Sequence, residues 1–433
     1  MNVAMLTNTY LPHVGGVARS IDALAADLRQ LGHRVLIITP TFAQRDTPSR
    51  EEKDVIRVPA IENFNGSDFS LRLPIPLILN QAVEDFKPDI IHSHHPFLLG
   101  DTALRLARRY NIPLVFTHHT FYEKYTHYIP LKSERIKQFA MHLSTEYANL
   151  CTAVIAPSES VAELIKRRGV ETPIEVIPSG VDLDFFARGN GGTFRKHYNI
   201  DPSRPIIGHL GRLALEKNLG YLAEAMATVL ERSPHACFVL AGDGPVRADL
   251  EQFFSNRKLE QRVIFSGNRT GRELADALCA MDIFVFTSLS ETQGMVLTEA
   301  MAAGVPVVAL DAPGAREVVE DGDNGRLLDA NASAENFADA VLGELQLASV
   351  DASARRLRAL ENARRFSRGV CVEKALALYR RLIACHLSKA HPVNGENEET
   401  LNMLDRLRYQ IKAEWELFYE KSMAAAKTVT HNE

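Results

Sequence analysis

Two glutamates separated by seven residues, Glu291 and Glu299, are the side chains in this sequence best placed for binding chemistry. They bracket a turn at 292–294, which follows an apolar run at 283–286 and leads into good helix formers at 296–303. This order predicts a buried parallel strand, a turn and a helix. Backbone N–H groups at a helix start suit a phosphate, and the two carboxylates can accept hydrogen bonds from two sets of hydroxyls. The pattern therefore fits a ligand with a diphosphate centre and a sugar at either end.

Two cations occur in a second strand-to-loop segment. Arg212 and Lys217 follow an apolar run at 206–210 and Gly211. An arginine supplies directional hydrogen-bond donors and a lysine supplies a compact positive charge, so the pair suits a diphosphate. The alternative is two solvated cations near a helix start.

The stretch E-T-Q-G-M-V-L-T-E resembles the E-x7-E signature of the family-4 retaining glycosyltransferases, which have the GT-B fold. The resemblance implies that Glu291 contacts hydroxyls of the donor sugar and that Glu299 binds the ribose of the nucleotide. It further implies a backbone cradle for the diphosphate and sugar, made by Thr292, Gln293, Gly294, Met295 and Val296. The alternative is a surface pair of glutamates on an ordinary strand-helix unit.

Other motifs of the same family are present along the chain. The stretch G-R-L-A-L-E-K-N resembles the family's diphosphate clamp, in which Arg212 and Lys217 would stabilise the leaving nucleoside diphosphate. The resemblance adds a set of further donor-binding positions in glycine-containing loops: Gly16, Gly211, Gly244, Asn268 and Arg269. A plain flexible turn remains the alternative for the Gly15-Gly16 pair.

Histidines cluster in the N-terminal half of the chain, at 92–95, at 118–119 and at 127. A zinc site is disfavoured because no H-E-x-x-H motif and no cysteine partner accompany them. In the family, a histidine just past a strand faces the donor sugar. His119 is the best match to that catalytic position and His118 is the second choice.

The stretch H-T-F-Y-E-K-Y-T-H-Y-I-P, which starts at His119, resembles the diacylglycerol 3-glucosyltransferase branch of the family. It implies an acceptor groove lined by Tyr122, Tyr125, His127 and Tyr128. A packed loop is the alternative. Lipid-glycosylating members carry a basic face, yet residues 1–185 hold 19 Lys and Arg against 21 Asp and Glu, a net charge of −2. An apolar stretch at 71–79 and local basic patches keep a lipid acceptor open.

Composition sets broad limits on function. The chain has 433 residues, 46% hydrophobic and 24% charged, with a net charge of −5, which is typical of a globular protein and gives no reason to expect nucleic-acid binding. The five cysteines are scattered, which favours reduced thiols in a cytosolic protein. The N-terminus lacks a signal-peptide pattern, and no apolar run reaches the ~18 residues of a membrane span. We expect a cytoplasmic protein that can meet the inner face of the cell membrane only peripherally.

Strand and helix patterns alternate along the chain, with strands expected at 3–7, 35–39, 90–92, 114–117 and 153–156 and a first helix at 20–31. Such alternation predicts parallel sheets covered on both faces. Together with the resemblance, it predicts an α/β chain of the GT-B class, with two Rossmann-like domains facing across a cleft and a C-terminal crossover helix. The expected ranges are 1–185 for the acceptor side, 186–369 for the nucleotide-sugar side, 370–390 for the crossover helix, and 391–433 for a linker and an extra helix.

The resemblance implies a retaining hexosyltransferase that moves a sugar from a nucleotide-diphosphate sugar to a hydroxyl acceptor such as diacylglycerol. UDP-glucose is the expected donor type, although these residues determine neither base nor sugar. No cofactor and no metal are expected, and the oligomeric state stays open. A nicotinamide or P-loop enzyme is disfavoured because G-x-G-x-x-G is missing from the first loop and a Walker motif from the whole chain. A soluble sugar, inositol-lipid or polysaccharide acceptor remains open, as does a non-catalytic nucleotide-sugar-binding module.

Overall fold

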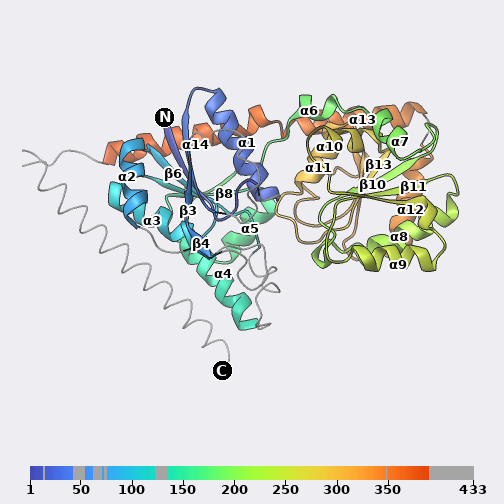
Figure 1. The fold of residues 1–433 in the computed structure, drawn as a ribbon, viewed down its shortest axis with the longest axis horizontal. Helices are drawn as coiled ribbons and strands as arrows, with labels where there is room; N and C mark the ends of the chain where they lie inside the picture. The colour runs from blue at the N-terminus through green and yellow to red at the C-terminus, as the bar shows by residue number, and fades with distance from the viewer. Residues whose placement is uncertain are drawn as a thin grey trace, which may run out of the picture. The chain divides into compact units, whose positions relative to one another are not determined.

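The computed structural model describes residues 1–12, 15–41, 54–61, 71–72, 76–121, 134–347 and 349–389 (Figure 1). The chain divides into two units. The N-terminal unit contains Met1–Pro178 together with the chain from Cys371 onward, and the C-terminal unit contains Ser179–Val370. The sequence interpretation places these two divisions after residues 185 and 369.

A seven-stranded sheet forms the centre of the N-terminal unit, with strand order β3-β2-β1-β6-β7-β8-β9 and every neighbouring pair parallel. Its strands are β1 (Asn2–Leu6), β2 (Arg34–Pro40), β3 (Val55–Val58), β6 (Ile90–Ser93), β7 (Leu114–Thr117), β8 (Ala153–Ala156) and β9 (Ile174–Val176). The five strands predicted in this half are confirmed to within one residue at either end. A short antiparallel pair, β4 (Ala60–Ile61) and β5 (Leu71–Arg72), lies outside this sheet.

Helices bury both faces of this sheet. Alternate residues of β1 enter different cores, since Ala4 and Leu6 pack in one cluster while Val3 and Met5 pack in the other. The first cluster is completed by side chains of α2 (Pro76–Phe86), α3 (Leu99–Tyr110), α4 (Glu134–Asn149) and α5 (Glu159–Arg167). The second is completed by α1 (Gly16–Gln30) and α14 (Arg368–Lys389). This two-sided burial explains why the strands read as continuous apolar runs.

The first helix begins earlier than the sequence indicates. We expect it from residue 20, with Gly16 in the preceding loop, but α1 starts at Gly16 itself. Gly15 has an extended backbone, and its carbonyl already accepts a hydrogen bond from Arg19 N–H at 3.1 Å. The loop prediction for Gly16 is therefore wrong, because Val17, Ala18 and Arg19 continue the helical hydrogen bonding.

The C-terminal unit is built on a six-stranded parallel sheet with strand order β12-β11-β10-β13-β14-β15. Its strands are β10 (Ile206–Leu210), β11 (Cys237–Ala241), β12 (Val263–Gly267), β13 (Ile283–Phe286), β14 (Val307–Leu310) and β15 (Gly325–Leu328). One face packs on α6 (Leu183–Ala187), α7 (Gly191–His197), α10 (Gly271–Ala280), α11 (Met295–Ala302) and α13 (Ser349–Arg364). The other packs on α8 (Leu219–Arg232), α9 (Arg247–Asn256) and α12 (Ala334–Leu345).

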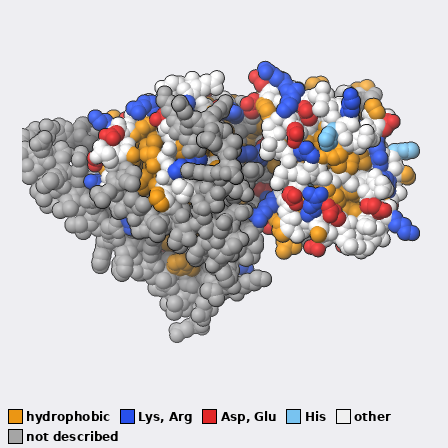
Figure 2. All heavy atoms as spheres, viewed as in Figure 1, with side chains coloured by type: hydrophobic (Ala, Val, Ile, Leu, Met, Phe, Trp, Pro, Cys, Tyr) orange, Lys and Arg blue, Asp and Glu red, His pale blue; other side chains and the backbone are white. Residues whose placement is uncertain are grey.

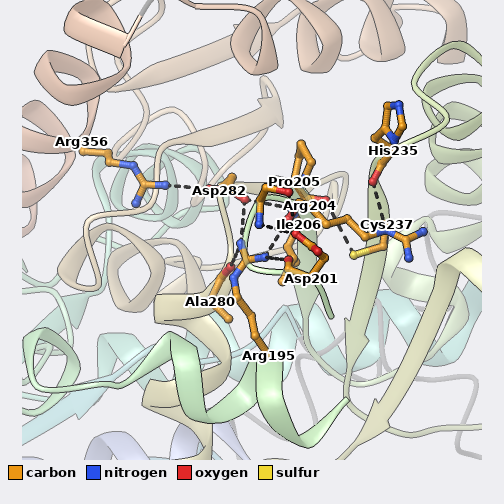
Figure 3. A network of polar contacts seen from close by, with 11 residues as sticks. Arg195, Asp201, Arg204, Pro205, Ile206, His235, Cys237, Ala280, Asp282 and Arg356 are labelled. Atoms are coloured by element: carbon orange, nitrogen blue, oxygen red, sulfur yellow. Dashed lines mark hydrogen bonds and ion pairs between the residues drawn. The ribbon is translucent and has the colours of Figure 1, made fainter. Parts of the chain in front are cut away.

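Asp282 ties together the amino ends of two central strands of this sheet (Figure 3). Its carboxylate accepts a hydrogen bond from Ile206 N–H at 2.9 Å and from Arg195 at 3.1 Å. Its other oxygen accepts from Arg356 of α13, also at 3.1 Å. The network therefore joins β10, β13, α7 and α13 at the strand ends that lie away from the loops with the predicted site residues.

The last described helix belongs with the N-terminal unit. Tyr379 of α14 hydrogen-bonds His92 at 2.6 Å, and His386 hydrogen-bonds the carbonyl of Asn111 at 2.7 Å. This helix occupies the range where the sequence predicts a crossover element. The further helix predicted within 391–433 lies outside the described residues.

Charged side chains of both signs are scattered among polar and hydrophobic groups over the face of the C-terminal unit that Figure 2 shows. Ion pairs of this unit include Arg232 with Glu335 and with Asp339, at 2.7 Å each. No helix among the described residues is long and apolar enough to cross a membrane.

Candidate functional site

The turn between β13 and α11 is shaped by glycines that no other residue could replace without strain. Gly294 has a φ of +68°, in the left-handed region. A Cβ there would lie 2.9 Å from Leu297 Cδ1 and 3.0 Å from the Gly314 carbonyl oxygen. Gly314, with a φ of +87°, approaches equally closely, since its Cβ would lie 2.8 Å from Glu291 Cβ. The segment around Gly314 therefore packs directly behind the turn and fixes its shape.

The start of α11 leaves backbone donors available at the end of this turn. Gly294 caps the helix without a side-chain hydrogen bond, and the first turn contains no acidic residue. The first N–H groups of a helix have no partner within the helix, and its dipole is positive at that end. Met295 and Val296, two of the predicted cradle residues, are the first two residues of this helix. The arrangement can bind an anion at its backbone.

Lys217 and Glu291, 74 residues apart in sequence, form an ion pair at the mouth of the turn. Only 17% of the Lys217 side chain and 20% of the Glu291 side chain are exposed. Burial alone raises the pKa of Glu291. The charge and hydrogen bond of Lys217, with a hydrogen bond from Ser288, outweigh it, so the pKa lies below the ordinary value. Glu291 is therefore ionised at neutral pH beside a fixed cation.

Hydroxyl groups at the end of β13 hold the Lys217 loop in place. Ser290 donates to the carbonyl of Glu216 at 3.1 Å, and Thr287 donates to the carbonyl of Asn218 at 3.3 Å. The Asn218 amide in turn donates to the Thr287 carbonyl at 3.3 Å. Sequence reasoning missed these positioning residues. The T-S-L-S run before Glu291 is the only signal that points to them.

The loops after β10 and β11 approach each other at three glycines. A Cβ on Gly244 would lie 2.3 Å from the Leu213 carbonyl oxygen, and one on Gly242 would lie 1.9 Å from the Gly211 carbonyl oxygen. Leu213 N–H donates to the Asp243 carbonyl at 2.9 Å. The predicted positions Gly211 and Gly244 therefore lie in two loops in direct contact.

Arg212 and Lys217 lie at opposite ends of the loop that follows β10. The side chain of Arg212 is exposed at the start of this loop, whereas Lys217 ends it in a short 3-10 helix, Leu215–Lys217. The structure thus brings Lys217 to Glu291 and leaves Arg212 at the surface of the same unit.

Gln293, in the turn, and Glu299, within α11, both have buried side chains. Each is 5% exposed. The Gln293 amide forms two hydrogen bonds with the backbone of Ser179, accepting from its N–H at 2.6 Å and donating to its carbonyl at 2.8 Å. Ser179 is the first residue of the C-terminal unit. The turn is therefore fastened to the point where the chain enters this unit, a contact that the sequence did not reveal.

Asn268 and Arg269 follow β12 as predicted. Asn268 is exposed. The Arg269 guanidinium bonds the Tyr198 hydroxyl and the Ser266 carbonyl and pairs with Glu273 at 3.0 Å. The Arg269 side chain is thus held within the protein, so this loop presents the Asn268 side chain and backbone groups to a ligand.

In the N-terminal unit, His119 follows β7 and forms a hydrogen bond with His94 at 3.0 Å between His119 Nε2 and His94 Nδ1. Burial, reinforced by neighbouring histidines, holds the pKa of both rings well below the ordinary value. Beside them, His92 bonds Thr117 at 2.7 Å and Tyr379. His119 is therefore a neutral imidazole at neutral pH.

Four predicted acceptor-side residues, Tyr122, Tyr125, His127 and Tyr128, lie outside the described residues. Within the described part of the chain, no group of three or more His, Cys, Asp or Glu side chains is arranged to hold a metal ion. Gly16 and His119 belong to the N-terminal unit, and the other described site residues belong to the C-terminal unit.

Family models match both halves of the chain. Residues 14–185 match the model described as Glycosyltransferase Family 4, and residues 204–346 match the model described as Glycosyl transferases group 1. Each match falls largely within one of the two units and includes its parallel sheet or most of it.

Similar proteins include two bacterial enzymes and one solved structure. An alpha-monoglucosyldiacylglycerol synthase of Streptococcus pneumoniae is 33% identical over 333 residues, which cover 74% of this chain and 74% of that protein. A GDP-mannose-dependent alpha-mannosyltransferase of Mycobacterium tuberculosis is 32% identical over 79% of this chain and 87% of that protein. The solved sucrose-phosphate synthase of Thermosynechococcus elongatus matches with a TM-score of 0.73 at 22% identity, covering 89% of this chain and 99% of that one.

Three observations indicate the same family. The chain forms two Rossmann-like units with parallel sheets, and Glu291 of the E-x7-E turn pairs with Lys217 from the loop after β10. Two relatives are more than 30% identical over most of their length. The chain belongs to the family-4 glycosyltransferases and has their GT-B fold.

Proposed function

We propose that this glycosyltransferase is a retaining hexosyltransferase that uses a nucleotide-diphosphate sugar and glycosylates a hydroxyl of a glycolipid precursor such as diacylglycerol. The observation that carries the proposal is the Lys217–Glu291 ion pair beside the start of α11, because it joins a cation, a carboxylate and free helix N–H groups. The name of the Streptococcus pneumoniae relative supports glucose and diacylglycerol as the first pair to test.

The roles we propose for the C-terminal unit follow from these groups. The diphosphate binds at the N–H groups that begin α11, with Lys217 beside it and Arg212 reaching it from the loop start. Glu291 accepts hydrogen bonds from hydroxyls of the transferred sugar, and its lowered pKa keeps it ionised for that purpose. Glu299 accepts hydrogen bonds from the ribose.

The proposed chemistry proceeds on one face of the sugar. The bond between the anomeric carbon and the phosphate oxygen breaks while the acceptor oxygen bonds to that carbon, and the acceptor's proton moves to the departing phosphate. Lys217 and Arg212 stabilise the negative charge that develops on the phosphate, as fixed charges do best when water is excluded. His119 contacts the sugar as a neutral hydrogen-bonding group. No covalent enzyme nucleophile, metal or cofactor takes part in this proposal.

We propose that the acceptor binds to the N-terminal unit, with Tyr122, Tyr125, His127 and Tyr128 beside it, and that the enzyme reaches lipid peripherally from the cytoplasm. A second candidate donor deserves a test because the Mycobacterium tuberculosis relative is GDP-mannose-dependent. In that case the same site would transfer mannose.

The proposal is tested by incubating purified protein with radiolabelled UDP-glucose or GDP-mannose and vesicles that contain diacylglycerol. We expect one donor to yield a radiolabelled glycolipid whose sugar has the α configuration of the donor. A soluble product only, or a product of inverted configuration, would contradict the proposed acceptor or the proposed mechanism respectively. Binding of donor without turnover on any acceptor would favour a non-catalytic binding module.

A further inference from the structure

His209, near the end of β10, is a buried polar side chain that the proposed mechanism does not use. It is 1% exposed and its ring stacks near Phe284 and Phe286, with ring centroids 6.2 and 6.3 Å apart and planes within 24°. The other residues of β10 are apolar or glycine. Packing alone would favour a hydrophobic side chain at this buried position as well.

The hydrogen bond of His209 determines which ring nitrogen carries the proton. Nδ1 lies 3.0 Å from the carbonyl oxygen of Val285. A carbonyl only accepts hydrogen bonds, so Nδ1 must carry the proton and donate it. Burial lowers the pKa of His209 to about 4, with Lys217 lowering it and Glu291 raising it, so the ring is neutral at physiological pH. Nε2 therefore presents a bare lone pair.

That lone pair has no hydrogen-bond partner among the residues that the structure describes. A buried acceptor left without a partner is unfavourable by about 1–3 kcal/mol, so native proteins retain such groups rarely. A ligand that supplies the missing donor would remove this cost, whereas an analogue without that donor would leave the nitrogen unpaired. The lone pair is thus a second, independent sign of a ligand at this end of the sheet.

Nε2 lies close to Gly211, one of the glycines predicted for the donor site. A Cβ built on Gly211 would lie 3.5 Å from Nε2, and no other described atom beyond the glycine's own chain neighbours comes within 4 Å of that point. Gly211 begins the loop that ends at Lys217, and His209 interacts electrostatically with both Lys217 and Glu291. A ligand atom above Gly211 would therefore lie close to the imidazole nitrogen.

We propose that His209 Nε2 accepts a hydrogen bond from a hydroxyl of the transferred sugar and so contributes to the choice of donor sugar. A lone pair repels phosphate oxygens, which excludes the diphosphate as its partner. The position beside Glu291 favours the sugar over the ribose. This inference rests on the proposed function, since it requires a nucleotide sugar to bind in the C-terminal unit.

Two substitutions separate the lone pair from the packing of the ring. In His209→Asn, the side-chain amide can still donate to the Val285 carbonyl, but the atom at the Nε2 position is lost. In His209→Phe, the aromatic packing remains and both nitrogens are lost. Both variants should bind UDP as tightly as the wild type while binding UDP-glucose about 10-fold more weakly, as measured by calorimetry. If GDP-mannose proves to be the donor, GDP replaces UDP and GDP-mannose replaces UDP-glucose in this experiment.

Donor analogues that each lack one sugar hydroxyl identify the contact. Wild-type protein should bind several of these analogues more weakly, because Glu291 also contacts sugar hydroxyls. Only one of them should be bound by His209→Asn as tightly as that variant binds the complete donor. Equal weakening of UDP and UDP-glucose would overturn the inference, as would unchanged UDP-glucose binding. If neither nucleotide sugar binds to the wild type, the proposed function fails instead.

NMR spectroscopy of the wild-type protein tests the same contact without any substitution, so the test does not depend on whether the variants fold. In protein with ¹⁵N-labelled histidine, the Nε2 resonance of His209 should shift when UDP-glucose is added and stay in place when UDP is added. A shift of the same size with UDP alone would place the contact on the nucleotide and contradict the proposal. No shift with either ligand, under conditions where both bind, would contradict it as well.

Discussion

Lys217 is the residue on which the proposed chemistry depends most, because it is the cation fixed beside the start of α11. Replacing it with alanine should lower kcat about 100-fold or more, since removal of one preorganised group that stabilises developing charge has an effect of that order. Lys196, an exposed lysine near the end of α7, serves as the matched control and should tolerate the same change. Steady-state kinetics with saturating donor measure both.

The same substitution has a second expected consequence at Glu291. Without the charge of Lys217, burial dominates and the pKa of the carboxyl should rise. Activity of the weakened variant should therefore require a higher pH than the wild type. A Lys217→Ala variant with wild-type kcat and the wild-type pH profile would contradict the role proposed for this ion pair.

At the scale of single elements, the amide of Gln293 fastens the donor turn to Ser179 through two hydrogen bonds. Gln293→Ala removes both partners from the half-buried backbone N–H and carbonyl of Ser179, which should destabilise the C-terminal unit by about 2 kcal/mol. The thermal unfolding midpoint should fall by several degrees. Gln252→Ala, which removes an exposed side-chain bond to Asn256, is the control and should change the midpoint little. Equal midpoints for the two variants would contradict this account.

Asp282 allows stability and activity to be separated. Asp282→Ala removes the acceptor of Ile206 N–H and the partner of Arg195 and Arg356. We expect a loss of about 2 kcal/mol because a third of the side chain is exposed. Since Asp282 lies at the amino ends of the strands, specific activity of the folded protein should stay near the wild-type value. A large loss of specific activity, at a temperature where circular dichroism shows the variant folded, would contradict that separation.

Particular residues show how far the sequence alone could lead. Apolar runs such as 283–286 predicted strands because the pattern of residue types is local to the sequence, and the E-x7-E turn was found because its spacing is local too. The bond from Gln293 to Ser179 joins residues 114 positions apart, and no pattern along the chain announces it. His209 was passed over because its position within a strand does not show what its ring faces. The helix start at Gly16 was missed because glycine ordinarily indicates a loop.

For the whole molecule, buried neutral histidines predict how stability depends on pH. The pKa values of His92, His95 and His209 are lowered by burial to about 3, about 4 and about 4. In the unfolded chain each has a pKa of about 6.5. The unfolded state therefore binds more protons below that value, so stability is greatest above pH 6.5 and falls as the pH drops towards 4. Each histidine contributes at most about 1.4 kcal/mol per pH unit.

Thermal unfolding at pH 7.5, 6.0 and 5.0 checks this dependence, because these pH values lie above the pKa values of most carboxyl groups. We expect the midpoint to fall between pH 6.0 and 5.0, and His209→Asn should reduce the dependence. His235→Gln, which replaces an exposed histidine, should leave it unchanged. A midpoint that stays constant or rises as the pH is lowered would show that these rings are not buried in the neutral form.

A structure of the protein with bound UDP-glucose, or with GDP-mannose if that donor binds, tests the central claim most directly. We predict that a diphosphate oxygen lies within hydrogen-bond distance of Lys217 Nζ and of a backbone N–H at the start of α11, with the sugar beside Glu291. A nucleotide sugar bound elsewhere, with its diphosphate remote from both groups, would contradict the account.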